Sequence, residues 1–139
     1  MPRPHVVIIG SGFGGLFSAR ALAKADVDIT LVSKTAAHLF QPLLYQVATG
    51  ILSSGEIAPA TRDILANQKN AKVLLCEVSK INLNSHIVVA EKLSKQVILR
   101  YDYLIVAAGA GQSYFGNDHF ATFAPGMKSI DDALELRAR

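Results

Sequence analysis

The sequence of 139 residues has no tryptophan, a single cysteine and few charged side chains. Cys76 therefore has no partner for an intrachain disulfide, which fits a reducing compartment, and its apolar neighbours predict a small buried residue rather than a nucleophile. The apolar runs are shorter than the roughly 20 residues that a membrane-spanning helix needs. The first of them ends in glycines, which argues against a signal peptide.

The sequence also lacks the usual patterns of metal-binding, nucleic-acid-binding and hydrolase proteins. The four histidines are far apart without the spacing of metal ligands, so we expect no metal site. The net charge is +3 and the basic residues are scattered, which predicts a solvated surface and no nucleic-acid partner. Residues 111–116, GQSYFG, have one residue too many for a nucleophile elbow. Half of the residues are hydrophobic, which fits one globular domain over residues 1–139.

The strongest positive signal lies in the stretch His5–Ala25. Its residues 6–9 are a continuous β-branched run, typical of a strand that is buried in a parallel sheet. Gly10, Gly12 and Gly15 follow with the spacing G-x-G-x-x-G, and apolar residues then recur at helical intervals. A strand, a glycine turn and a helix in this order form the context that a dinucleotide-binding motif requires.

Each glycine of the motif has its own expected role. Gly10 allows the tight turn, Gly12 lets the backbone approach a pyrophosphate, and Gly15 brings the helix close to the strand. The amides of Phe13, Gly14 and Gly15 open the helix, where N–H groups and the positive end of the dipole suit a doubly charged anion. The alternative is a tight turn that binds no ligand, and the flanking strand and helix favour the dinucleotide site.

Residues 27–32 predict a second strand, parallel to the first, which completes a βαβ unit. Such folds usually place an acid at the end of this strand to hold ribose hydroxyls, whereas this chain has Ser33 and then Lys34. Ser33 can still form a hydrogen bond with a ribose hydroxyl. Lys34 can lie along the adenosine or meet a 2′-phosphate, so NADP is retained as a rival ligand.

The segment 38–50, HLFQPLLYQVATG, combines large apolar side chains with amide groups. Pro42 can begin a short helix, in which Leu43 and Leu44 cover apolar surface and Gln41 supplies hydrogen-bonding groups. Such a wall suits a flat ring system with a polar edge, and the alternative is an ordinary core helix. No C-x-x-x-x-C pair occurs here, so we expect electrons to leave the ring directly for an external acceptor.

The middle of the chain predicts more strands. Residues 59–67 read as a short helix, and Ala71–Val78 as a third parallel strand that brings Glu77 and Val78 toward the adenosine side. The hydrophobic period then changes. Short antiparallel strands are predicted at 81–84, 86–90 and 96–100, with turns at 84–85 and 91–95. The fold class is therefore α/β, a Rossmann-like parallel sheet with a β-meander in place of a crossover helix.

A last parallel strand, Tyr103–Ala108, ends at Gly109, where open α/β sheets bind ligands. Residues 112–128 predict a long irregular loop rich in aromatic side chains. Ser129 then caps a helix, with Asp132 completing a capping box. No glycine or proline ends this helix before the sequence stops, so we expect the chain to be a fragment of a longer protein.

Five segments together resemble the type II NADH dehydrogenases, which are single-subunit, FAD-containing NADH:quinone oxidoreductases that do not pump protons. The segments are GSGFGG at 10–15, HLFQPLLYQVATG at 38–50, GEIAPATR at 55–62, YDYLIVAAGA at 101–110 and FAPGMKSIDDALELR at 123–137. The resemblance implies a flavoprotein with two dinucleotide-binding domains. Residues 1–139 would be its FAD-binding part, with the NADH-binding and membrane-binding regions beyond them.

The resemblance also implies a set of cofactor contacts, with no catalytic side chain among them. These are Gly10, Gly12, Phe13, Gly14 and Gly15 at the pyrophosphate, Ser33 and Lys34 at the ribose and adenosine, Val78 at the adenine through its backbone, Gln41, Pro42, Leu43 and Leu44 at the flavin ring, and Ala108 and Gly109 beneath that ring. Two positions depart from the superfamily pattern, because Ser33 replaces an acid and Ala108 replaces a frequent threonine.

The function implied is electron transfer from NADH through FAD to a membrane quinone, by a peripheral homodimer at the cytoplasmic face of the cell membrane. The cofactor would do the bond chemistry while the protein orients and tunes it, and residues 1–139 alone would be inactive. Two alternatives are retained. One is an NAD(P)-binding oxidoreductase domain without flavin, and the other is a nucleotide-sensing module that does no chemistry.

Overall fold

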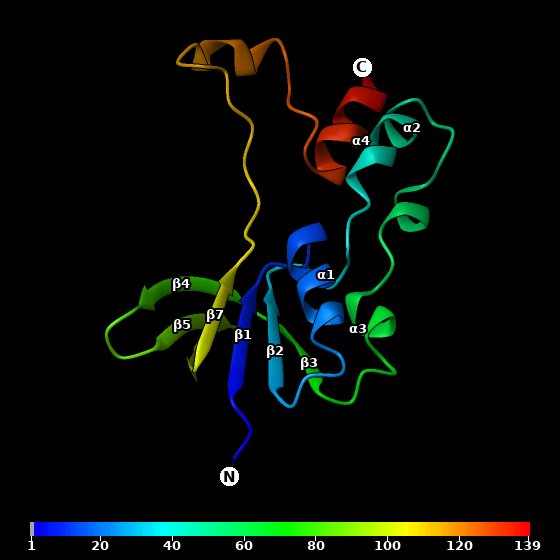
Figure 1. The fold of residues 1–139 in the computed structure, drawn as a ribbon. Coiled ribbons are helices and arrows are strands. Elements are labelled where there is room, and N and C mark those ends of the chain that lie inside the picture. The colour runs from blue at the N-terminus through cyan, green and yellow to red at the C-terminus, as the bar shows by residue number, and fades with distance from the viewer. Residues whose placement is uncertain (1) are drawn as a thin grey trace. The chain divides into compact units, whose positions relative to one another are not determined.

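The computed structural model describes residues 2–139, which divide into two compact units (Figure 1). The first unit runs to His38 and resumes over Ala60–Gly109. The second unit is formed by Leu39–Pro59 and Ala110–Arg139. Each unit is therefore built from two separate stretches of the chain.

A four-stranded parallel sheet forms the centre of the first unit. Its strands follow the order β3 (Ala71–Leu75), β2 (Asp28–Ser33), β1 (His5–Ile9) and β7 (Tyr103–Val106). Helix α1 (Phe13–Ala21) joins β1 to β2, so the predicted βαβ unit is confirmed. The last strand is two residues shorter than the predicted one.

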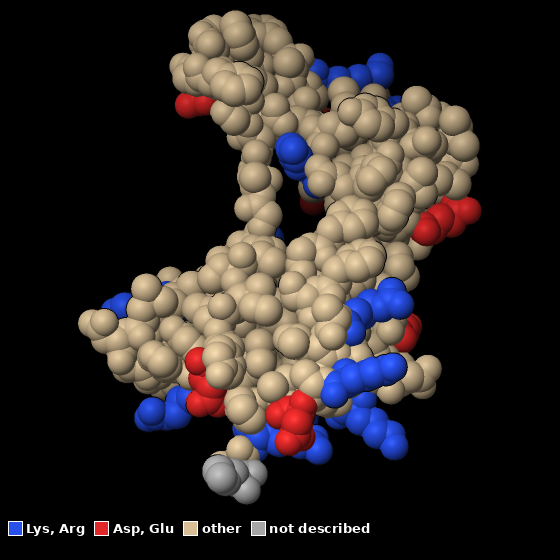
Figure 2. Space-filling view, in the orientation of Figure 1, with Lys and Arg blue, Asp and Glu red and all other residues tan. Residues whose placement is uncertain are grey.

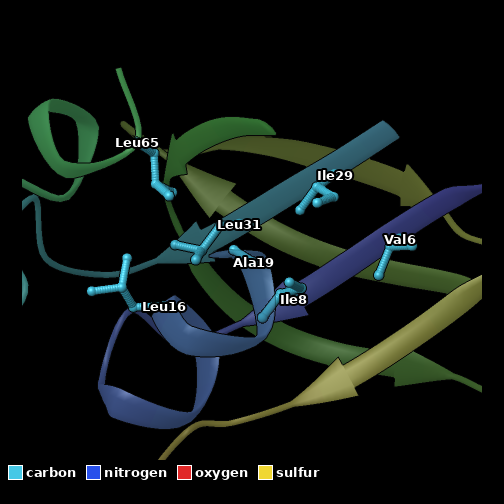
Figure 3. Close-up of a cluster of buried hydrophobic side chains, with 7 residues drawn as sticks. All are labelled: Val6, Ile8, Leu16, Ala19, Ile29, Leu31 and Leu65. Atoms are coloured by element: carbon cyan, nitrogen blue, oxygen red, sulfur yellow. The ribbon is translucent and has the colours of Figure 1, made fainter. Parts of the chain in front are cut away.

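Helices cover one face of this sheet. Alternate residues of β1 and β2 point toward α1 and toward Leu65, which follows the short helix α3 (Thr61–Ile64) (Figures 1 and 3). The cluster consists of Val6, Ile8, Leu16, Ala19, Ile29, Leu31 and Leu65. Each large side chain buried in this way stabilises the fold by about 1.5–3 kcal/mol. The predicted helix 59–67 is shorter in the structure.

A second sheet, antiparallel and three-stranded, covers the other face of the parallel sheet. It consists of β4 (Glu77–Asn82), β5 (Ile87–Lys92) and β6 (Lys95–Arg100), in that order. Val7, Ile9 and Val32 of the parallel sheet pack against Val88 and Ala90 of β5. The predicted β-meander is confirmed, and the fold class is α/β with a Rossmann-like parallel sheet.

The structure corrects two boundaries of the predicted strands. Ala71–Val78 is not one parallel strand. β3 ends at Leu75 and pairs parallel with β2, whereas β4 begins at Glu77 and pairs antiparallel with β5. The predicted turn 91–95 is a two-residue turn instead, Leu93–Ser94, and both residues have positive φ (48° and 61°). Positive φ at both positions is typical of the type I′ turn that joins twisted antiparallel strands.

The second unit consists of short helices around its own apolar cluster. In chain order these are η1 (Gln41–Leu43), α2 (Leu44–Ala48), η2 (Ser54–Ile57), η3 (Asp118–Thr122) and α4 (Ile130–Ala138). Leu44, Val47, Ile57 and Ala133 form the buried centre of the cluster. The predicted helix after Pro42 is confirmed, with a 3-10 turn at its start. The predicted irregular loop 112–128 contains the 3-10 helix η3.

The capping box of α4 is confirmed as well. Ser129 Oγ accepts a hydrogen bond from the Asp132 amide at 3.2 Å, and the Asp132 carboxylate accepts one from the Ser129 amide at 2.8 Å. Hydrogen bonds from the amide of Lys128 and from Ser129 lower the pKa of the Asp132 carboxyl group. The charged form of Asp132 therefore stabilises the start of this helix.

The short apolar runs and the scattered charges of the sequence each have a counterpart in the structure. None of the helices among residues 2–139 has the length and apolar character needed to cross a membrane. On the face seen in Figure 2, basic and acidic side chains are interspersed. That face therefore shows no block of charge of one sign.

Replacing Gly15 with alanine tests the packing of α1 on β1. A Cβ atom at Gly15 would lie 1.8 Å from the backbone oxygen of Gly10, which cannot move aside without shifting the turn. We expect Gly15→Ala to lower the free energy of unfolding by about 3 kcal/mol, the upper end of typical overpacking costs. Urea unfolding without ligand measures this loss. Gly12→Ala is the matched control, because among the described residues nothing lies within 4 Å of its Cβ. Equal urea midpoints for the two variants would contradict the interpretation.

Candidate nucleotide-binding cleft

A cleft of about 330 Å³ opens in the first unit, where the parallel strands reach their carboxyl ends. Open α/β sheets bind ligands at this edge. Seven residues predicted for the cofactor site line the cleft: Gly10, Gly12, Ser33, Lys34, Val78, Ala108 and Gly109. These residues come from four segments that are far apart in the sequence, so the fold brings together most of the predicted pyrophosphate and adenosine positions.

Phe13, Gly14 and Gly15 form the first turn of α1, immediately after Gly12. The Leu16 amide donates to the Gly12 carbonyl at 3.0 Å, which marks the start of the helical hydrogen bonds. The amides of Gly14 and Gly15 precede this bond, so helix geometry gives them no carbonyl partner within α1. The Phe13 ring lies 5.2 Å from the His38 ring, edge to face.

The four residues predicted for the flavin ring belong to the second unit. Pro42 is exposed, Gln41 and Leu43 are half-buried, and the Leu44 side chain is fully buried in the apolar cluster of that unit. Because the core uses the Leu44 side chain, a contact of this residue with a ring would have to involve its backbone. The contact of all four residues with a flavin stays a prediction.

The glycines of the motif differ in the reason why a larger residue could not replace them. Gly10 has a φ of +104°, and a Cβ there would lie 2.2 Å from the Ala107 carbonyl oxygen. Gly15 is required by its close approach to Gly10. Gly12 has an ordinary φ of −69°, and its Cβ would point into open space among the described residues. Nothing in the folded chain therefore requires glycine at position 12, whereas a ligand in the cleft would.

A hydrogen-bonded pair of serines connects the motif to the end of β2. Ser11 Oγ lies 2.7 Å from Ser33 Oγ, and both side chains are buried. The Thr35 amide donates to Ser33 Oγ at 3.3 Å. His38 Nδ1 lies 2.8 Å from the Ser11 carbonyl oxygen, so this ring nitrogen carries the hydrogen and donates it. These bonds fix the glycine turn on β2, and the sequence interpretation missed the part played by Ser11.

The cleft also contains residues that the sequence interpretation left out of the site. Cys76 lines it beside Val78, and Ala107 lines it beside Ala108. Glu77, which the sequence predicts to lie toward the adenosine side, lines it as well. Burial raises the pKa of the Cys76 thiol, and the charge of Lys92 opposes that effect. The thiol is therefore poorly ionised at neutral pH, which agrees with its prediction as a structural residue.

The charged groups of the cleft are few. Among its described residues Lys34 is the one cation and Glu77 the one carboxylate. No cluster of three or more His, Cys, Asp or Glu residues within 2–139 could hold a metal ion. The arrangement suits binding of an anionic nucleotide by backbone groups and offers no evident acid–base pair.

Comparison with known proteins assigns the chain to a family. The family described as pyridine nucleotide-disulphide oxidoreductase matches residues 4–139. The chain belongs to this family. It is 69% identical over 137 residues to the type II NADH:quinone oxidoreductase NdhA of Mycobacterium tuberculosis, and 68% identical over 139 residues to Ndh of the same organism. Both alignments cover 99% of this chain. The predicted resemblance is confirmed.

The chain spans only 29% of the length of NdhA and 30% of that of Ndh. A solved structure, NDH2 from Plasmodium falciparum in complex with NADH, is 31% identical with a TM-score of 0.84. That match covers 97% of this chain and 28% of the other. The fold is thus shared with the part of that protein that the match covers.

Alkylation of Cys76 tests the environment of the cleft. Because burial raises the pKa of the thiol, we expect iodoacetamide to react slowly in the folded chain, with a rate that rises at higher pH than for an ordinary thiol of pKa about 8.5. The pH profile is measured by mass spectrometry. The same chain in concentrated urea is the control and should follow the ordinary profile. Identical profiles in both conditions would contradict the burial of Cys76.

Proposed function

We propose that this chain forms the FAD-binding part of a type II NADH:quinone oxidoreductase, which passes electrons from NADH to a membrane quinone without pumping protons. The observation that carries the proposal is the 69% identity to NdhA of M. tuberculosis, because the aligned residues include the whole cleft. Since the chain spans 29% of that relative, the activity is proposed for a complete protein.

The first turn of α1 would hold the diphosphate of FAD. The amides of Gly14 and Gly15 lie at the positive end of the helix dipole, where an anion is stabilised. Gly12 would allow the phosphates to approach the backbone, since its missing Cβ leaves open space rather than relieving a contact within the protein. Phe13, the remaining predicted residue of this turn, would complete the pyrophosphate site.

The adenosine would extend along the last residue of β2 and the first residues of β4. Ser33 and Lys34 would contact its ribose, and the backbone of Val78 its adenine. By resemblance to the family, Gln41, Pro42, Leu43 and Leu44 would line the flavin ring, and Ala108 and Gly109 would form the end of the strand beneath it. When bound, FAD supplies the redox chemistry between NADH and the quinone, and this chain's residues bind and orient it.

Other features are proposed for the complete protein on the same resemblance. These are peripheral attachment to the cytoplasmic face of the membrane, a homodimeric state and a separate NADH site. No nucleic-acid partner is expected, since the basic residues of the sequence are scattered.

The absorbance of the complete protein tests the flavin. We expect the gently purified protein to show flavin absorbance bands, which NADH bleaches and a soluble quinone analogue restores. Absorbance spectra taken before and after each addition give the measurement. A colourless protein that takes up no added FAD would overturn the proposal.

Replacing Gly12 with valine tests the position of the diphosphate. The side chain would fill the space proposed for the phosphates, so we expect the complete Gly12→Val protein to lose FAD while it stays folded. The flavin content per protein and the circular dichroism spectrum are measured together. Gly55→Val is the matched control, because its Cβ also points into open space but lies in the second unit. Full flavin occupancy in Gly12→Val would mean that the phosphates lie elsewhere.

One observation favours a second candidate, an NAD(P)-binding domain without flavin. Lys34 is the one cation among the described residues of the cleft, and it lies beside Ser33, which brings no charge to repel a 2′-phosphate. Stoichiometric binding of NADPH by a protein that takes up no flavin would support this candidate. Nucleotide binding without turnover of NADH and a quinone analogue would support the sensing module instead.

A further inference from the structure

The ribose end of the cleft lacks the acceptor that such sites usually have. A carboxylate at the end of β2 can accept hydrogen bonds from both ribose hydroxyls, whereas this chain has Ser33. The Ser33 hydroxyl already accepts from the Thr35 amide and shares a hydrogen bond with Ser11. A hydroxyl has one hydrogen and two lone pairs, so Ser33 has capacity for one further bond. One of the two ribose hydroxyls therefore needs another partner.

Glu77 lies where it can supply that partner. The amide of Cys76 donates to the Ser33 carbonyl at 2.9 Å, and this bond holds the start of β4 at the end of β2. Glu77 is the first residue of β4, and it lines the same cleft as Ser33 and Lys34. The break between β3 and β4 thus brings Glu77, the first residue of β4, to the cleft beside the end of β2.

The Glu77 carboxylate is not used by the fold. No hydrogen bond or ion pair of this side chain occurs in the described part of the chain, and the side chain is exposed. Its partner across the β4–β5 ladder is Glu91, another acid. Like charges directly opposite each other destabilise a sheet. Glu77 therefore costs the fold some stability and leaves its acceptor oxygens available to a ligand.

We propose that Glu77 accepts hydrogen bonds from the ribose hydroxyls of the adenosine half of FAD, in the place of the acid that Ser33 replaces. The inference rests on the proposed function and adds a specificity-determining residue to it. In this arrangement the ribose hydroxyls bind two residues, Ser33 at the end of β2 and Glu77 at the start of β4.

Titration of the complete apoprotein with FAD tests the proposal, with flavin fluorescence as the readout. We expect Glu77→Gln to bind FAD about tenfold more weakly, because a charge-assisted hydrogen bond is replaced by a neutral one. Glu91→Gln is the matched control, since it removes the same cross-strand repulsion but does not line the cleft. Both variants should gain equally in urea midpoint without ligand.

The sign of the change separates the proposal from general electrostatics. FAD carries negative phosphates, so loss of a nearby carboxylate that makes no hydrogen bond would leave FAD binding unchanged or make it tighter. Weaker binding by Glu77→Gln with unchanged binding by Glu91→Gln supports the proposal. Equal or tighter binding by Glu77→Gln overturns it and leaves the proposed function intact. Failure of the wild-type protein to bind FAD would instead overturn the proposed function.

Two FAD analogues identify the group that Glu77 contacts. With a 2′-deoxyadenosine analogue, we expect the wild-type protein to lose affinity and the Glu77→Gln variant to lose less. With a hypoxanthine analogue, which lacks the adenine amino group, the effect of Glu77→Gln should remain about tenfold. If the effect disappears with hypoxanthine and persists with deoxyribose, Glu77 contacts the base and the ribose assignment is wrong.

Discussion

The close contact between helix α1 and strand β1 is the constraint on which the cleft depends. A Cβ atom at Gly15 would lie 1.8 Å from the Gly10 carbonyl oxygen, so the helix reaches its position because residue 15 has no side chain. This contact holds the first turn of α1, which is the positive end of the helix dipole, at the carboxyl end of β1. A larger residue would push the helix outward and move its amides away from the cleft.

The parallel sheet can hold β1 in this position because both of its faces are covered. Val7 and Ile8 are consecutive in the chain and yet both fully buried, one against the antiparallel sheet and the other against α1. The antiparallel cover also shapes the site. In a βαβ unit a helix would begin where β3 ends, whereas here β4 begins there and brings Glu77 and Val78 to the cleft.

The sequence could predict features that depend on local spacing and not those set by distant partners. The order of the elements and the roles of the glycines follow from patterns within a few residues. The change from parallel to antiparallel pairing at Cys76 depends on which distant strands lie beside β3 and β4, and residues 71–78 contain no turn signal. The positive φ of Leu93–Ser94 is imposed by the strands on either side, because neither residue is the glycine or asparagine that usually marks such a turn. The bond between Ser11 and Ser33 joins residues 22 positions apart, which no local pattern reveals.

The motif combines glycines that the fold requires with one that it does not, and this separates stability from ligand binding. Gly10 and Gly15 are needed for the turn and the packing, whereas the space in front of Gly12 is open. In the cleft the charges of Lys34 and Glu77 oppose each other, so side chains contribute no net charge toward a diphosphate. Backbone amides and the helix dipole would then supply most of the attraction, and they are already fixed by the fold. Discrimination between dinucleotides would consequently depend on the few side chains at the adenosine end, where this chain has replaced the usual acid.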